Sequence, residues 1–257
     1  MTSPVLELDA VSYAYRGSAA PVVTDVSVAV EAGQSLALVG ESGAGKTTLL
    51  RMLLGLARPT AGTVRFDGDE LRLRDRTQMK AFRRSVQCVF QDPYASLDPR
   101  RRVRRIVAEP LRSLGVASGD DAGRRVAEAL ERVGLPADAA ERYPHEFSGG
   151  QRQRIAIARA TVCDPRVLLA DEPVSALDVT TRVKVVDLLA ELKETAGLTV
   201  VMVSHDLSAV AALCERTAVL ERGRVVESGA TSAVLGAPEH AYTRRLLASV
   251  PRLPARA

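Results

Sequence analysis

Residues Gly40–Thr48 read G-E-S-G-A-G-K-T-T, and this stretch decides the fold. It matches the pattern G-x-x-x-x-G-K-[ST] at every fixed position, directly after the apolar segment Ser35–Val39. Helically spaced leucines follow it, at Leu49, Leu50, Leu53 and Leu54. Glycines allow successive backbone N–H groups to converge on phosphate oxygens, and the helix start adds about +0.5 charge. The stretch therefore predicts a strand, a phosphate-binding loop (P-loop) and a helix, rather than a chance run of glycines.

The residues of the P-loop have separate expected roles. Lys46 is expected to bridge the β- and γ-phosphates of ATP, and the Thr47 hydroxyl is expected to hold Mg²⁺. The predicted nucleotide-binding residues of the loop are Gly40, Glu41, Ser42, Gly43, Ala44, Gly45, Lys46, Thr47 and Thr48.

A second motif is an apolar strand that ends in two acids, V-L-L-A-D-E at Val167–Glu172. Asp171 is placed to orient Mg²⁺ through its water shell. Glu172, one residue further, could polarise an attacking water. Two acids at a strand end often only face solvent, but beside a P-loop they favour hydrolysis of a nucleotide.

Composition excludes several classes of protein. Of the 257 residues, 46% are hydrophobic and 26% charged, which is typical of a globular domain. No apolar run reaches the length of about 18 residues that a membrane span needs, so we expect a cytoplasmic protein. The net charge of +4 is too small to indicate nucleic acid, and we expect no nucleic-acid partner. The spacing of Cys88, Cys163 and Cys214 predicts buried, reduced thiols.

The order of the elements predicts an α/β protein. Continuous apolar runs at Ser35–Val39, Val167–Ala170 and Leu198–Val203 are typical of parallel strands covered on both faces. Alternating patterns near the N-terminus predict a flanking antiparallel sheet, at Leu6–Val11, Val26 to Val30 and Thr63–Phe66. A hairpin is expected at Ala218–Leu220 and Arg224–Glu227, and a short helix at Ala241–Ser249.

A third motif, F-S-G-G-Q at Phe147–Gln151, points to a family. It resembles the signature L-S-G-G-Q of the ABC ATPases, with Phe147 in place of leucine. Ser148, Gly149 and Gly150 would open a helix over Gln151–Val162 and form a second anion site. One domain already has its P-loop, so this second site is expected to complete the nucleotide site of a neighbouring copy. The motif argues against a P-loop kinase or GTPase.

The resemblance implies roles for four further positions. Tyr15 aligns with the aromatic residue that stacks on adenine, with Tyr13 as a rival. Gln91 matches the glutamine that senses Mg²⁺, the attacking water and the membrane subunit. Asp178 belongs to the loop that crosses the dimer interface, and His205 matches the histidine that contacts the γ-phosphate. Catalytic roles are thus expected for Glu172, His205, Gln91 and Lys46, and metal contacts for Thr47, Gln91 and Asp171.

The resemblance also implies an architecture. We expect a P-loop NTPase (RecA-like) core with a parallel sheet and the antiparallel sheet in residues 1–91 and 161–235. A helical subdomain with the signature is expected at 92–160, and a tail at 236–257. The chain would be the ATP-hydrolysing subunit of an ABC transporter on the cytoplasmic face of the membrane. Its expected partners are two transmembrane permease subunits, a second ATP-binding subunit in a homo- or heterodimer, and a substrate-binding protein.

Longer stretches resemble one subfamily, the ATPases of dipeptide, oligopeptide and nickel importers. They lie at Phe90–Arg100, Tyr143–Arg154, Ala170–Thr180 and Pro238–Leu247, the last with Ala241 where proline is usual. Import of peptides or nickel is therefore expected. The alternatives are an ABC exporter ATPase and a soluble ABC ATPase acting on nucleic acid or ribosomes.

The segment P-R-R-R-V-R-R at Pro99–Arg105 has two interpretations. It is either a solvated helix face or a docking patch for acids of the membrane partner or for lipid head groups.

Overall fold

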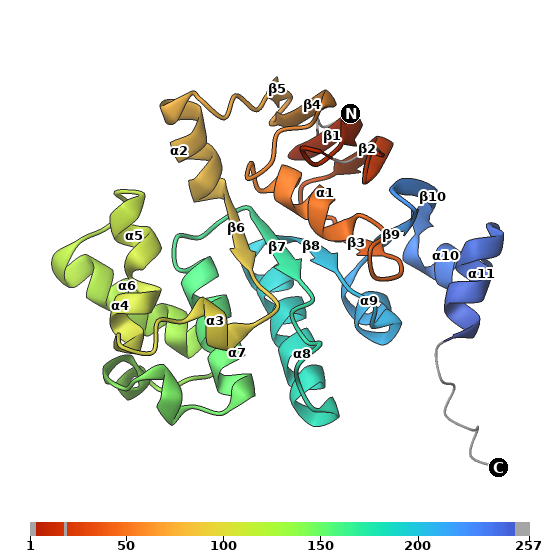
Figure 1. Ribbon diagram of the computed structural model, residues 1–257. Helices are drawn as coiled ribbons and strands as arrows, with labels where there is room; N and C mark the ends of the chain where they lie inside the picture. The colour runs from red at the N-terminus through yellow and green to blue at the C-terminus, as the bar shows by residue number, and fades with distance from the viewer. Residues whose placement is uncertain (1–3, 18–19, 250–257) are drawn as a thin grey trace, which may run out of the picture.

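The computed structural model describes residues 4–17 and 20–249, which form two sheets with helices around them (Figure 1). The smaller sheet is antiparallel with strand order β2-β1-β4-β5. Its strands are β1 (Leu6–Tyr13), β2 (Val23–Val30), β4 (Ala61–Phe66) and β5 (Asp69–Glu70). Every second residue from Val26 to Val30 is buried, as the alternating sequence predicts.

The larger sheet has the strand order β10-β9-β3-β8-β7-β6. Its strands are β3 (Leu36–Val39), β6 (Val86–Val89), β7 (Val167–Asp171), β8 (Thr199–Val203), β9 (Arg216–Glu221) and β10 (Arg224–Ala230). All pairs are parallel except the hairpin of β9 and β10 at the edge. The predicted α/β fold with a parallel core sheet and an antiparallel flanking sheet is therefore confirmed.

Five of the helices flank the two sheets. They are α1 (Lys46–Leu53), α2 (Arg76–Ser85), α8 (Val179–Ala196), α9 (Leu207–Leu213) and α10 (Thr231–Gly236). Helix α11 (Ala241–Ala248) is the last element of the described chain. The tail residues 250–257, with Pro251 and Pro254, lie outside the described residues.

A helical region is inserted between β6 and β7, and Figure 1 shows it beside the β6 edge of the larger sheet. It holds α3 (Pro93–Ser96), α4 (Val103–Val107), α5 (Glu109–Ser113), α6 (Gly119–Arg132), α7 (Gly149–Thr161) and 3₁₀ turns at Ala137–Glu141 and Pro144–Glu146. The helix that carries the third motif begins at Gly149, two residues before the expected start. The chain leaves α6 through Gly134, whose φ of +67° is typical of a glycine after the end of a helix.

Burial of the larger sheet on both faces explains its continuous apolar runs. Alternate residues of β8 fall into two core clusters: Val200 and Met202 pack with the helical region, and Val201 and Val203 pack with α1. Strand β6 was missed by the sequence analysis. It is short, lies at the sheet edge, and its central Gln87 and Cys88 are only half-buried, so its apolar signal is weak.

The three cysteines are free thiols, as expected, but only Cys214 is fully buried. Cys88 and Cys163 are half-buried, so the prediction of buried thiols is wrong for these two. Burial nevertheless raises the pKa of Cys88 to about 12 and that of Cys163 to about 11.

No helix in residues 4–17 and 20–249 is both long enough and apolar enough to cross a lipid bilayer.

Candidate nucleotide-binding site

The P-loop connects β3 to α1 and depends on glycine at two positions. A Cβ on Gly40 would lie 2.3 Å from the carbonyl oxygen of Leu220, so only glycine fits against β9. Gly45, at φ +104°, is the residue from which α1 starts. The loop therefore ends with unpaired backbone N–H groups at a helix N-terminus, an arrangement that suits phosphate.

Lys46 is buried, and backbone carbonyl groups of the P-loop hold its ammonium group. Its Nζ donates to the carbonyl oxygens of Gly40, at 2.6 Å, and Glu41, at 2.8 Å. An ammonium group has three donors, so one is left for a phosphate oxygen. Burial lowers the pKa of Lys46, and the charges of Glu172, Asp171 and Glu41 oppose that shift. The acids thus favour the charged form of the lysine, which is the form that binds phosphate.

Asp171 and Glu172 lie at the carboxyl end of β7, where both side chains are half-buried. Burial, followed by the neighbouring charge of Glu172, raises the pKa of Asp171, while Lys46 and Arg51 act against the shift. In the described part of the chain, the Asp171 carboxylate accepts no hydrogen bond and forms no ion pair. A half-buried carboxylate without such a partner fits a hard divalent cation with oxygen ligands, such as Mg²⁺.

Glu172 is the centre of a hydrogen-bonded cluster. Its Oε1 lies 3.2 Å from Nδ1 of His205, and its Oε2 accepts from Nε2 of Gln91 at 3.2 Å. Its backbone adopts the left-handed region, φ +45°, and its N–H donates to the carbonyl of Val203 on β8. Gln91 follows β6 and His205 follows β8, so the parallel strands on either side of β7 bring these residues together.

Tyr15 is the aromatic residue at the other end of the site. Its hydroxyl lies 3.4 Å from the hydroxyl of Thr48, and 43% of its surface is exposed. Tyr13 meets the Tyr15 ring edge-on, with centroids 5.1 Å apart, and packs against the core. Only Tyr15 of the two lines the groove described next, which favours it over its rival.

A groove of about 1010 Å³ joins these residues. From the predicted set it is lined by Tyr15, Gly40, Glu41, Ser42, Gly43, Gly45, Lys46, Thr47, Thr48, Gln91, Glu172 and His205. Ala44, also a residue of the loop, is buried. Asp171 lines a separate, smaller hollow together with Gln91. The groove is also lined by Arg182 on α8, Leu246 on α11 and Ser249 directly after α11, none of which was predicted from the sequence. Their sequence neighbourhoods carry no glycine loop or paired acids that could have indicated them.

The predicted second anion site lies elsewhere in this chain. Ser148 caps α7: its Oγ accepts from the N–H of Gln151, and its N–H donates back to Oε1 of Gln151. Ser148, Gly150 and Gln151 line a separate hollow of about 240 Å³, together with Thr181 of α8. Asp178 caps α8 by accepting from the N–H of Thr181. Within the described residues, Ser148–Gln151 and Asp178 do not line the P-loop groove, so one chain does not join its two anion sites.

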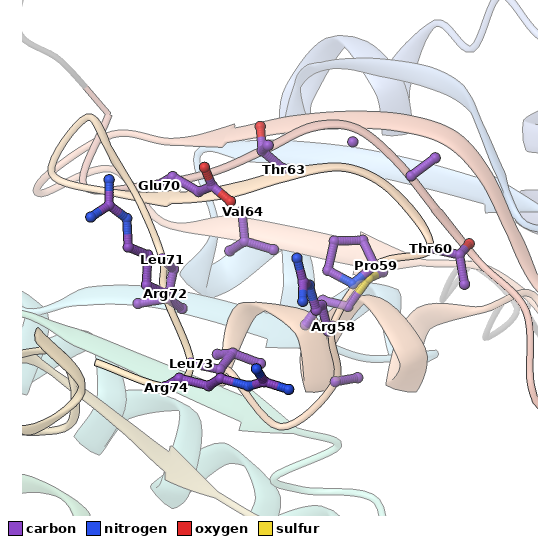
Figure 2. Close-up of a pocket in the computed structure, with 14 residues that line it drawn as sticks. Arg58, Pro59, Thr60, Thr63, Val64, Glu70, Leu71, Arg72, Leu73 and Arg74 are labelled. Atoms are coloured by element: carbon purple, nitrogen blue, oxygen red, sulfur yellow. The ribbon is translucent and has the colours of Figure 1, made fainter. Parts of the chain in front are cut away.

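Another hollow, of about 450 Å³, lies between β4, β5 and the segment after α1 (Figure 2). Arg58, Arg72 and Arg74 are among its lining residues. None of the predicted site residues lines it, so it is distinct from the candidate nucleotide site.

Comparison with known proteins identifies the family of this chain. A model of the ABC transporter family matches residues 23–175. Glutathione import ATP-binding protein GsiA of Salmonella typhimurium and of Escherichia coli is in each case 48% identical over 229 residues, 89% of this chain. The chain spans 37% of the length of these relatives.

Two solved structures share the fold over most of the chain. The first is cbiO1 from Clostridium perfringens, part of the ABC transporter complex cbiONQ, with a TM-score of 0.82 and 28% identity over 91% of this chain and 92% of that one. The second is the dimeric post-hydrolysis state of the ATP-binding cassette MJ0796 bound to ADP and Pi, with a TM-score of 0.77 and 33% identity over 88% and 98%. By sequence and by fold, the chain belongs to the ABC transporter family.

Proposed function

We propose that this chain binds and hydrolyses ATP as the energy-supplying subunit of an ABC importer. The observation that carries the proposal is the groove in which a glycine loop, a buried lysine and the hydrogen-bonded cluster around Glu172 meet. Phosphate, a divalent cation and an attacking water each have a matching group there. Family membership and the ADP-bound relative support the same function.

Each residue of the groove has its own role in ATP hydrolysis. Lys46 and the loop N–H groups hold the phosphates, while Thr47, Asp171 and Gln91 would hold Mg²⁺ and its waters. When bound, Mg²⁺ would neutralise negative charge on the phosphate oxygens. Glu172 accepts a proton from the attacking water, and His205 donates a hydrogen bond to the γ-phosphate. Tyr15 stacks on the adenine.

The separation of the two anion sites supports a dimer. The loop Ser148–Gly150 of one copy caps the ATP held by the P-loop of the other, and Asp178 lies at the interface between them. The relative MJ0796 is dimeric in a post-hydrolysis state that holds both ADP and Pi. In this chain ATP joins the two subunits, and they separate once phosphate has left after hydrolysis, because ADP alone lacks the γ-phosphate that both subunits bind. The partner is a second copy or a similar ATP-binding subunit.

This motion drives transport through two permease subunits, to which the chain binds from the cytoplasmic face of the membrane. The cargo is delivered by a substrate-binding protein. Import of peptides or nickel is supported by the resemblance of four stretches to importers of these substrates. The name of the 48% identical relatives, a glutathione import protein, also supports import of a small peptide.

The test is ATP binding and hydrolysis by the purified chain, alone and with its membrane subunits in proteoliposomes. We expect Glu172→Gln to keep the Kd for ATP within about twofold while lowering kcat by at least about 100-fold, because a general base contributes about that much. Lys46→Ala is the control that removes phosphate binding. Hydrolysis by Glu172→Gln at the wild-type rate would remove Glu172 from the mechanism, and wild-type ATP binding no tighter than that of Lys46→Ala would overturn the function.

A further inference from the structure

The tail helix α11 contacts the P-loop through one buried side chain. The backbone N–H of Glu41 donates to the hydroxyl of Tyr242 at 2.9 Å. The Tyr242 ring is only 3% exposed and packs in the same core cluster as Val39, the last residue of β3. The ring is thus held firmly in the core, while its hydroxyl reaches the loop.

This contact fixes the peptide on which the lysine rests. In the peptide unit that joins Gly40 and Glu41, the N–H of Glu41 is held by Tyr242 and the carbonyl oxygen of Gly40 accepts from Nζ of Lys46 at 2.6 Å. The next carbonyl, that of Glu41, accepts from Nζ of Lys46 at 2.8 Å and from the N–H of Ala44, which closes the first turn of the loop. Rotation of the Gly40–Glu41 peptide unit would therefore move an acceptor of Lys46. No other side chain among the described residues hydrogen-bonds the N–H of Glu41.

Helix α11 is itself anchored to the hairpin of the larger sheet. The carboxylate of Glu227 on β10 accepts from the N–H groups of Glu239 and His240, at 2.9 and 3.1 Å. His240 caps the helix by accepting from the N–H of Tyr242 at its Nδ1. Arg245 forms an ion pair with Glu221 on β9, at 3.3 Å. The contacts of Glu227, His240 and Arg245 thus fix the position of α11, and with it that of Tyr242.

The face of α11 that carries Tyr242 continues into the nucleotide groove. Leu246 and Ser249 lie four and seven positions after Tyr242, on the same side of a helix, and both line the groove. The tail helix is therefore a wall of the candidate site and also a support for its loop.

We propose that Tyr242 is a positioning residue for nucleotide binding, which holds the peptide unit between Gly40 and Glu41 so that Lys46 is aimed at the phosphates. The inference rests on the proposed function, because it concerns the same groove. It follows that the packing of α11 against the P-loop and the β9–β10 hairpin determines how tightly the groove binds ATP. A change that loosens the tail helix would weaken ATP binding without touching a residue that contacts phosphate.

Tyr242→Phe tests this by removing the hydroxyl and keeping the ring. We expect the Kd and KM for ATP to rise about three- to tenfold, since a net hydrogen bond is worth about that factor, with kcat within about twofold of wild type. Hydrogen exchange of the Glu41 amide should become faster by a similar factor. Tyr143→Phe is the matched control, because it removes a tyrosine hydroxyl from the helical region, and it should change none of these values.

Glu227→Gln is a second variant, which weakens the anchor of α11 and leaves Tyr242 in place. It should raise the Kd for ATP in the same direction and by a smaller factor, and it decides the question if Tyr242→Phe is unstable. Unchanged Kd and unchanged Glu41 exchange in these variants would overturn the inference, as would a loss of thermal stability and kcat with Kd unchanged. A wild-type chain that fails to bind ATP would instead refute the proposed function.

Discussion

Gly150 shows how a single residue can connect two loops of this site. A Cβ added there would lie 2.2 Å from Cγ2 of Thr181, which is closer than real side chains approach. Thr181 donates its N–H to Asp178, so the signature loop and the loop of Asp178 are packed against each other through these two residues. This contact favours glycine at position 150, whereas the backbone angle there does not require it.

We expect Gly150→Ala to displace the start of α7 and to destabilise the fold by about 1–3 kcal/mol, the usual cost of overpacking. Thr181→Ser removes the clashing methyl group, after which the next atom of Thr181 is 3.5 Å away. The double variant should therefore recover most of the loss. Urea unfolding of the three variants measures this, and equal stabilities of the single and double variants would contradict it.

At the scale of the helix, α4 has one face in the core and one in solvent. Val103, Ile106 and Val107 are buried, while Arg104 and Arg105 are exposed. Arg102 and Arg104 form surface ion pairs with Glu141 of the same chain, at 2.8 and 3.4 Å. Such pairs contribute about 0–1 kcal/mol. The arginines therefore add little to the stability of the fold. Both interpretations of the segment Pro99–Arg105, a solvated face and a docking patch, remain possible.

Charge reversal of Arg104 and Arg105 to glutamate separates these interpretations. If the patch docks on acids of the permeases, the double variant should lose about tenfold or more in affinity for the membrane complex, with ATP binding by the isolated chain unchanged. Arg124 and Arg132 on α6, which also form surface ion pairs, provide a control with the same change in charge. Unchanged assembly and coupled ATPase activity would establish a solvated face.

At the scale of the whole molecule, the helix N-termini at Lys46 and Gly149 both suit anions and lie at separate hollows. Two chains placed face to face would turn these half-sites into complete ones. The same arrangement makes ATP a ligand of both subunits, so that its hydrolysis changes the association of the subunits.

The Glu172→Gln variant should therefore become a dimer with Mg-ATP and stay a monomer with ADP, as measured by light scattering. Adding Ser148→Glu to it places a negative charge opposite the γ-phosphate, and should abolish the dimer while the Kd for ATP stays within about twofold. Ser113→Glu on α5 is the control for an added acid. A dimer that forms equally well with Ser148→Glu would contradict the shared site.

Local sequence determined the parts of this protein that depend on neighbouring residues. The P-loop, the two acids at the end of β7 and the helix that opens at Ser148–Gly150 were all predicted, because each is a short pattern whose chemistry needs only glycines, a helix start or a strand end. The class of the fold followed from continuous apolar runs, since strands buried on both faces leave no polar face to alternate.

Tertiary structure alone decided which distant residues meet. Strand order placed Gln91 and His205 on the two oxygens of Glu172, across 81 residues in the first case. The packing of α11 brought Tyr242 to Glu41, and Leu246 and Ser249 into the groove, across 201 residues at the hydrogen bond. Local propensity carries no information on such contacts, because they depend on how sheets and helices pack after they form.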